Sequence, residues 1–172
     1  EDTTARLLKL AHAYEIDFVL ASQPIQDERL EVRELFTEEL LLALPPGHPL
    51  TRKRIVNAAD LESERLIVMK EGHCLGDQVL GFCDRRDLHP HISFRSAQLE
   101  TIQALVCSGL GLSLVPAMAA RREREDLPEY RSLQSPRPER KIVAVWPRQR
   151  PPGRAAKEFL KCVSTRVRKA RS

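Results

Sequence analysis

The sequence predicts an α/β fold in which strands and helices alternate along the chain. Short apolar runs of strand length, such as 66–69 and 112–115, are separated by segments with helical spacing, such as 98–107. Prolines and glycines gather between these runs, most clearly at 45–49, and indicate turns. Because strands that alternate with helices form βαβ units, we expect a largely parallel sheet. With 172 residues the chain can bury a sizeable core, as one domain or as two small lobes.

The first half of the chain is expected to open with a helix and to continue mainly with strands. Leu7, Leu8 and Leu10 lie on one side of the opening helix, and Thr3 or Thr4 supplies its start signal. The expected elements are, in order, a helix at 3–13, strands at 16–20 and 33–44, a turn at 45–49, a helical turn at 59–61 and a strand at 66–69.

The second half alternates helices with strands more regularly. Leu99, Ile102 and Val106 share one face of a helix that Gly109 ends. The expected elements are, in order, a short helix at 72–83, a strand at 92–94, a helix at 98–107, a strand at 112–115, a charged loop at 121–126, a proline-rich loop at 135–138, a strand at 141–146 and a helix at 153–170.

The composition is that of an ordinary soluble globular protein. Hydrophobic residues make up 42% of the chain and charged residues 30%, and 28 basic against 24 acidic residues give a net charge of +4. No apolar run reaches the length of a membrane-spanning helix, and the first residues show no signal-peptide pattern. We therefore expect no membrane partner, and the use of cysteine, described next, favours a cytoplasmic protein.

The cysteine content argues against a disulfide scaffold and against a metal site. Four cysteines are too few to staple a secreted protein of this size, and no two of them form the C-x-x-C pair of a zinc site. We expect neither a metal nor a cofactor. In the cytosol thiols persist and a disulfide is transient. Cys107 and Cys162 follow apolar residues, and we expect both to be small buried hydrophobes.

Cys74 and Cys83 are the most informative residues of the chain. They stand nine residues apart in the segment 72–83, where Cys74 follows His73 at the expected helix start. The positive end of the helix dipole favours a thiolate at that position. If the helix continues to Cys83, the two sulfurs face opposite ways and the Cα atoms are about 13 Å apart. A disulfide needs Cα atoms within roughly 7 Å, so joining the pair requires the helix to unwind. Gly76 and Gly81 favour such remodelling, and the arrangement suits a redox switch.

Three strings resemble the effector-binding domain of LysR-type transcriptional regulators. They are Leu44-Pro45-Pro46-Gly47-His48-Pro49-Leu50, Ala59-Asp60-Leu61 and Gly109-Leu110-Gly111-Leu112-Ser113-Leu114-Val115-Pro116. The resemblance implies two α/β lobes of the periplasmic-binding-protein type II kind. The chain would cross between them at hinge residues near Phe36 and Thr37 and near Ile142. Lobe one would then hold 1–36 and 143–172, and lobe two 37–142.

The same resemblance implies that the chain begins inside lobe one, after the family's opening strand and helix. The family's N-terminal helix-turn-helix segment is absent from the printed sequence. Contact with DNA and RNA polymerase is therefore expected of the parent protein only, which would be a homodimer or homotetramer. The domain itself is not expected to be an enzyme.

Within the family, Gly72-His73-Cys74 with Asp77 and Phe82-Cys83 closely resembles the members that sense hydrogen peroxide. The resemblance makes Cys74 the peroxide-reacting (peroxidatic) cysteine and Cys83 the resolving one. It places Thr4, His73, Asp77 and Arg140 around the peroxide. Thiol-disulfide reductants would reset the switch.

Two positions depart from the pattern, and some matched residues have a simpler interpretation. Gly76 stands where an arginine is expected, whose charge would favour the thiolate, and Ser93 replaces a histidine. Thr4 can also be a helix N-cap, and Asp77 a complement to the helix start. Arg140 can simply pair with a neighbouring carboxylate.

Three other functions remain open at this stage. A LysR-type domain can bind a small organic effector, with the cysteines incidental. A thiol peroxidase shares the sulfenic acid chemistry but turns over many times. A periplasmic solute-binding protein shares the fold.

Overall fold

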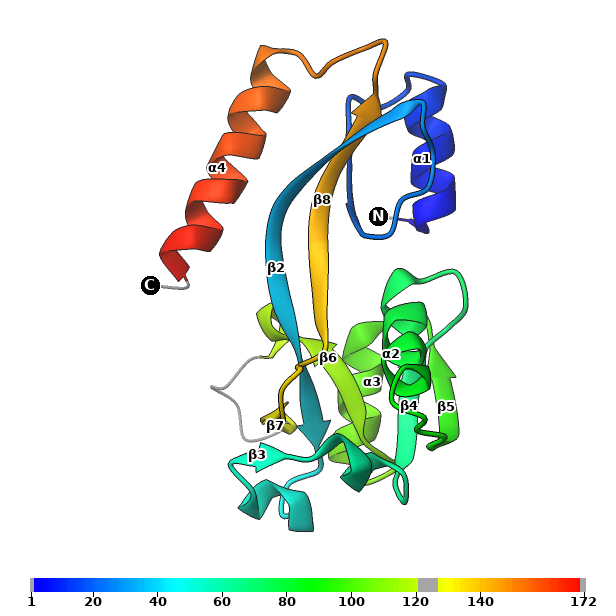
Figure 1. Cartoon of the computed structure of the whole chain (residues 1–172), viewed down its shortest axis with the longest axis vertical. Helices are drawn as coiled ribbons and strands as arrows, with labels where there is room; N and C mark the ends of the chain where they lie inside the picture. The colour runs from blue at the N-terminus through cyan, green and yellow to red at the C-terminus, as the bar shows by residue number, and fades with distance from the viewer. Residues whose placement is uncertain (1, 121–126, 171–172) are drawn as a thin grey trace. The chain divides into compact units, whose positions relative to one another are not determined.

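The computed structural model of the chain describes residues 2–120 and 127–170, so the charged loop expected at 121–126 lies outside the described residues. The chain divides into two compact units, one of Glu1–Thr37 with Arg140–Ser172 and one of Glu38–Glu139. The lobe boundaries expected from the resemblance lie one and three residues from these divisions and stay a prediction. Figure 1 shows the course of the chain.

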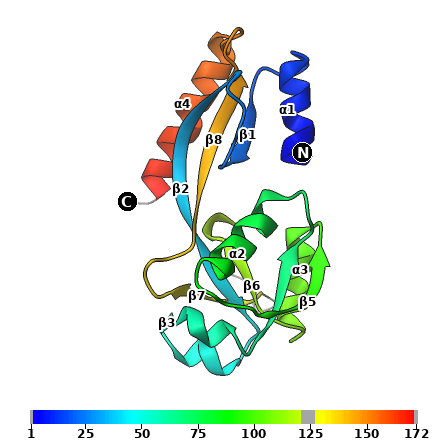
Figure 2. The ribbon, with the colours of Figure 1, turned by 45° about the vertical axis from the view of Figure 1, so that its right-hand side comes forward.

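Unit 1 is built on three neighbouring strands. Its elements are α1 (Thr4–His12), β1 (Val19–Ser22), the first part of β2 (Leu30–Leu44), most of β8 (Glu139–Pro147) and α4 (Arg154–Ala170). β1 pairs antiparallel with β8, and β8 neighbours β2 in the same sheet. Helices α1 and α4 lie on opposite sides of these strands (Figure 2). The core of the unit gathers Ala11, Val19, Leu30, Val143 and Val145.

Unit 2 contains the remaining strands and the helix that carries the two cysteines. Its elements are the end of β2, the 3-10 helix η1 (Pro49–Arg52), β3 (Ile55–Val56), η2 (Ala58–Leu61), β4 (Arg65–Met69), α2 (Cys74–Asp84), β5 (His91–Ser96), α3 (Leu99–Cys107), β6 (Ser113–Pro116), η3 (Ala117–Ala119) and β7 (Glu129–Leu133). β4 pairs parallel with β5, and the Leu66–Leu112 bridge joins β4 in parallel to the segment that leads into β6.

The strand pairing is mixed, so the expectation of a largely parallel sheet is wrong. In the described part of the chain, β1/β8, β2/β6 and β2/β7 are antiparallel, whereas β3/β7 and β4/β5 are parallel. Parallel pairs form where a helix connects the strands, as α2 does between β4 and β5. The antiparallel pairs all involve β2 or β8, two long strands that each contribute residues to both units.

The expected helices are confirmed with small shifts at their ends, and two strands were not foreseen. α1, α2, α3 and α4 each begin within two residues of the expected position. β3 and β7 were missed. β3 has only two residues, and β7 alternates charged and polar side chains without an apolar run. None of the described helices is long and apolar enough to cross a membrane.

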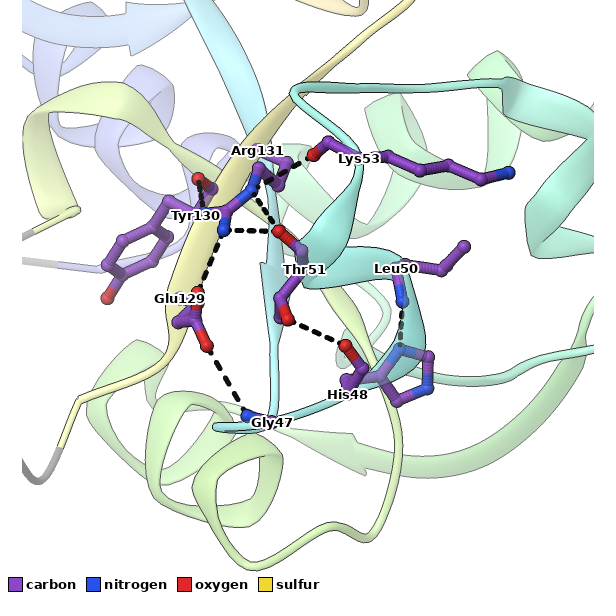
Figure 3. A network of polar contacts seen from close by, with 8 residues as sticks. All are labelled: Gly47, His48, Leu50, Thr51, Lys53, Glu129, Tyr130 and Arg131. Carbon is purple, nitrogen blue, oxygen red and sulfur yellow. Dashed lines mark hydrogen bonds and ion pairs between the residues drawn. The ribbon is translucent and has the colours of Figure 1, made fainter.

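A polar network fixes β7 to the segment that follows β2 (Figure 3). The Arg131 guanidinium donates to the Thr51 carbonyl from Nε at 3.1 Å and from Nη2 at 2.6 Å, and to the Lys53 carbonyl at 3.1 Å. Nη2 also meets Glu129 Oε2 at 2.8 Å. The other Glu129 oxygen accepts from the Gly47 amide at 3.3 Å. Arg131 therefore supplies hydrogen-bond donors to the carbonyls at the end of η1, which lack helical partners.

The largest core cluster of unit 2 holds one face of α2. Leu75, Val79, Phe82 and Cys83 are all buried there, with spacings of four, three and one residues. This spacing places the first three side chains on one helix face. The core thus fixes how α2 is rotated, and with it the direction of each cysteine.

Candidate functional site

A tight turn sets the start of α2. The His73 amide donates to the Lys70 carbonyl at 3.3 Å, and Gly72 lies between them with φ of +86°. A side chain at this φ would be strained, so glycine suits the turn. His73 is the N-cap residue, in extended geometry, and Cys74 is the first residue of the helix.

Cys74 is half-buried at this helix start and is not part of a disulfide. The N-terminal amides of α2 point towards the preceding turn, and they form the positive end of the helix dipole. His73 is half-buried and adjacent in sequence, and Asp77 is exposed in the first helical turn. The structure therefore brings three of the expected site residues onto one turn of one helix.

Cys83 has the opposite environment. Its side chain is 2% exposed within the core of unit 2, and it too is outside any disulfide. Burial raises the pKa of the Cys83 thiol, and the nearby negative charges of Asp84 and Glu62 raise it further. Glu62 is held in place by the His89 amide, which donates to Oε2 at 2.8 Å. Burial therefore favours the protonated thiol at Cys83, whereas Cys74 is half-buried at the first residue of the helix.

One continuous helix separates the two sulfurs. α2 runs from Cys74 to Asp84 without interruption. Nine residues of α-helix correspond to about 13 Å of rise and about half a turn of rotation. This confirms the expected helix start and the expected separation. In this conformation the pair cannot form a disulfide, because the Cα atoms must come within roughly 7 Å.

Gly76 has a packing role that the sequence did not reveal. It is buried where α2 crosses the end of β4, and a Cβ at this position would lie 2.7 Å from the Met69 carbonyl oxygen. A backbone oxygen in that position cannot move aside as a flexible side chain would. An arginine at position 76 would therefore have to displace α2 from the end of β4, and its effect on Cys74 stays a prediction.

Ser93, the other departure, has hydrogen-bond partners of its own. Its hydroxyl lies 3.4 Å from the carbonyl oxygens of Leu66 and Leu110. It therefore joins β5 to β4 and to the turn that precedes β6, a structural contact in this fold.

Thr4 and Arg140 belong to unit 1, whereas the cysteines belong to unit 2. Thr4 is the first residue of α1, and the residue at the N-cap position is Thr3, which makes no side-chain cap bond. The simpler interpretation of Thr4 as the N-cap is therefore wrong. Arg140 is the second residue of β8. Their place beside the peroxide stays a prediction.

The expected hinge residues lie within continuous strands. Phe36 and Thr37 are in β2, and Thr37 is the last residue before unit 2 begins. Ile142 is in β8, where it pairs with Ser22 of β1. Their role as hinges stays a prediction.

The remaining cysteines lie away from the pair in sequence and differ in exposure. Cys107 is half-buried at the end of α3, and Cys162 is exposed on α4. The expectation that Cys162 is buried is therefore wrong, since α4 turns Leu160 rather than Cys162 inward. Across residues 2–120 and 127–170, no group of three or more His, Cys, Asp or Glu side chains could hold a metal ion.

Sequence reasoning missed Arg86, which follows α2 and contacts its last turn. Its guanidinium carbon lies 4.8 Å from the centre of the Phe82 ring, and Nη2 donates to the Pro136 carbonyl. The spacing of four residues from Phe82 is the signal that could have indicated the first contact.

This fold and its sequence place the chain in a family of transcription regulators. The model of the LysR substrate binding domain matches residues 1–168, and the chain belongs to this family. The mixed α/β architecture of its two units is that of this domain.

More particular similarity points to one group of these regulators. The chain is 35% identical over 147 residues to the DNA-binding transcriptional dual regulator OxyR of Escherichia coli K12, covering 85% of this chain and 48% of that protein. The reduced OxyR regulatory domain from Pseudomonas aeruginosa superposes with a TM-score of 0.84 at 29% identity, covering 96% of this chain and 78% of that one. The oxidized form of OxyR gives 0.80 at 29% identity, with 97% and 79% covered. The chain spans about half the length of the curated relatives it matches.

Proposed function

We propose that this chain is the regulatory domain of a hydrogen-peroxide sensor, which works through a reversible disulfide between Cys74 and Cys83. The observation that carries the proposal is the placement of the two thiols at opposite ends of α2, in opposite environments and too far apart to bond. The similarity to OxyR regulatory domains in both redox states supports it.

The oxidation of the two cysteines proceeds in two steps. The Cys74 thiolate attacks one oxygen of hydrogen peroxide, the O–O bond breaks, and hydroxide leaves and takes up a proton to become water. The sulfur is now a sulfenic acid. The Cys83 sulfur then attacks that sulfenic acid, an S–S bond forms, and a second water leaves. Two thiols are oxidised and one peroxide is reduced to two waters.

The environments of the two cysteines support the proposed order of reaction. Cys74 lies at the positive end of the helix and is accessible to a small oxidant. Burial raises the pKa of Cys83 and shields its sulfur from peroxide. Cys83 therefore reacts only after part of α2 has opened, which makes it the resolving cysteine.

Polar neighbours complete the proposed peroxide site. His73 and Asp77 flank Cys74 on the same helical turn, and either can orient the peroxide through a hydrogen bond. We include Thr4 and Arg140 on the resemblance to peroxide-sensing regulators. Phe36, Thr37 and Ile142 are included as the residues at which the two long strands would bend.

The parent protein would convert this local change into altered transcription. Its DNA-binding segment, its contact with RNA polymerase and its dimeric or tetrameric assembly are proposed by analogy with the relatives. The disulfide forms once for each oxidation event and waits for a thiol-disulfide reductant, so the domain acts as a cytoplasmic sensor and not as an enzyme.

Thiol mass spectrometry before and after one equivalent of peroxide tests the proposal. We expect a Cys74–Cys83 disulfide in the unmodified chain and none in Cys74→Ser. Cys83→Ser should retain a sulfenic acid that dimedone labels at Cys74. Cys107→Ser and Cys162→Ser are matched controls, and both should form the disulfide normally.

Three results would contradict the proposal. Absence of any dimedone adduct on Cys74 would exclude it as the peroxidatic residue. Sustained steady-state consumption of peroxide in the presence of a dithiol would instead indicate a thiol peroxidase. If no thiol reacts at micromolar peroxide, a small organic effector becomes the better function.

A further inference from the structure

The two ends of α2 are held in different ways. At the first turn, Gly76 lies so close to the end of β4 that no Cβ fits against the Met69 carbonyl oxygen. This packing fixes Cys74 relative to β4. The last turn packs through side chains, among them Phe82, and a Cβ at Gly81 would meet only the end of the flexible Arg85 side chain. If Cys74 keeps its place, Cys83 has to travel to reach it.

Arg86 is the residue that holds the last turn of α2 from outside the core. Its amide donates to the Cys83 carbonyl at 2.9 Å, which tightens the end of the helix. Its guanidinium carbon lies 4.8 Å from the centre of the Phe82 ring, at a cation–π distance. Arg86 Nη2 donates to the Pro136 carbonyl in the 134–138 segment. One side chain therefore joins the neighbour of Cys83 to a loop 50 residues further along the chain.

The 134–138 segment is itself tied to the long strand β2. The Leu40 amide donates to the Pro138 carbonyl at 2.8 Å, and Arg137 Nη1 lies 3.1 Å from Glu39 Oε2. The segment leads directly into β8. The segment is therefore connected both to β2 and to β8, the two strands that contribute residues to both units.

We propose that Arg86 is a positioning residue that holds Cys83 in the reduced fold, and that its contacts with Phe82 and Pro136 must open before Cys83 reaches Cys74. This inference rests on the proposed function. Detaching Phe82 from the core pulls the ring away from the guanidinium, so oxidation also loosens the 134–138 segment. Arg86 then sets the rate of disulfide formation and passes the change towards β2 and β8.

Rapid-mixing kinetics of the reduced chain with peroxide tests the first part. Dimedone trapping follows sulfenic acid formation, and quenched thiol mass spectrometry follows the disulfide. In Arg86→Ala we expect disulfide formation about tenfold faster, with sulfenic acid formation unchanged; tenfold corresponds to about 1.4 kcal/mol of lost holding energy. Arg86→Lys, which keeps a cation over the ring, should fall between this variant and the wild type.

Arg85→Ala is the matched control, because Arg85 is the exposed neighbour in sequence. It should leave both rates at their wild-type values. If Arg86 had only a structural role, Arg86→Ala would lower the melting temperature but would not change the rate of disulfide formation relative to that of sulfenic acid formation. Equal rates of disulfide formation in Arg86→Ala and wild type would overturn the inference, whereas loss of sulfenic acid at Cys74 would overturn the proposed function itself.

Hydrogen exchange over 134–141 tests the second part. Oxidation of the wild-type chain should increase exchange in this segment. Arg86→Ala should show the increase already when reduced, and Arg85→Ala should not. If the disulfide forms and exchange in 134–141 stays the same, Arg86 does not transmit the change and the inference fails.

Discussion

Replacing Gly76 by alanine tests how tightly α2 is packed against β4. In an ordinary helix interior, glycine to alanine stabilises by about 0.5–1 kcal/mol. Here the new Cβ would lie 2.7 Å from the Met69 carbonyl oxygen and 3.3 Å from its carbonyl carbon. Both atoms belong to the backbone of a buried strand. The helix must therefore shift outward, at a cost of about 1–3 kcal/mol for overpacking.

The overpacking cost exceeds the helical gain, so Gly76→Ala should be less stable than wild type by about 1–2 kcal/mol. For a chain of this size that corresponds to a fall in melting temperature of about 2–8 °C. Gly81→Ala is the matched control on the same helix. There the Cβ would lie 3.3 Å from Arg85 Nη1, the end of a flexible side chain. Gly81→Ala should therefore gain about 0.5–1 kcal/mol.

Thermal unfolding followed by circular dichroism under dithiothreitol measures both variants in the reduced state. The reasoning predicts opposite signs for the two glycines. A Gly76→Ala chain as stable as wild type, with Gly81→Ala stabilised as expected, would refute the close approach of α2 to β4. It would also remove the argument that Cys74 keeps its place while Cys83 moves.

Three further predictions concern stability. Burial raises the pKa of Cys83 above its ordinary 9.0, so the contribution of this thiol to the unfolding free energy is complete below about pH 9 and is lost at higher pH. Cys83→Ser should therefore flatten the alkaline decline in unfolding free energy. Hydrogen bonds from Arg29 and His12 lower the pKa of Asp27 below its ordinary 3.8. The contribution of this carboxylate to the unfolding free energy is complete above about pH 5 and is lost on acidification. Asp27→Asn should therefore flatten the decline in unfolding free energy at acid pH. Arg131→Met removes the guanidinium that donates to the carbonyls at the end of η1, and it should lower the unfolding free energy measured in urea by about 2 kcal/mol. Removing the exposed Lys161 side chain is the control and should change the unfolding free energy by less than about 0.5 kcal/mol.

The cysteine helix could be predicted because its signals are local. Leu75, Val79 and Phe82 have the spacing of a buried helix face, and a glycine turn marks the start. Position along a helix then fixes the separation of the cysteines by arithmetic alone. The strand pairing could not be predicted in the same way, because pairing depends on residues far apart in sequence.

The two glycines of α2 show where a single sequence stops being informative. Both predict local flexibility, yet Gly76 lies against a strand backbone and Gly81 only against the end of an arginine. The difference comes from the end of β4, whose backbone lies against the first turn of α2 at Gly76. The role of Arg86 could not be predicted from the sequence for a similar reason, since its second partner, Pro136, is 50 residues away.

The continuous helix between Cys74 and Cys83 also has a thermodynamic consequence for the proposed sensor. If α2 is whole in the reduced chain and partly unwound in the oxidised one, every contribution to its helical stability favours the dithiol. For a two-electron couple, 1.4 kcal/mol corresponds to about 30 mV of reduction potential. The helical gain expected for Gly81→Ala would therefore raise the potential by about 10–20 mV, so that more oxidant is needed to close the disulfide. Residues of α2 that never touch peroxide would in this way tune the concentration at which the protein responds.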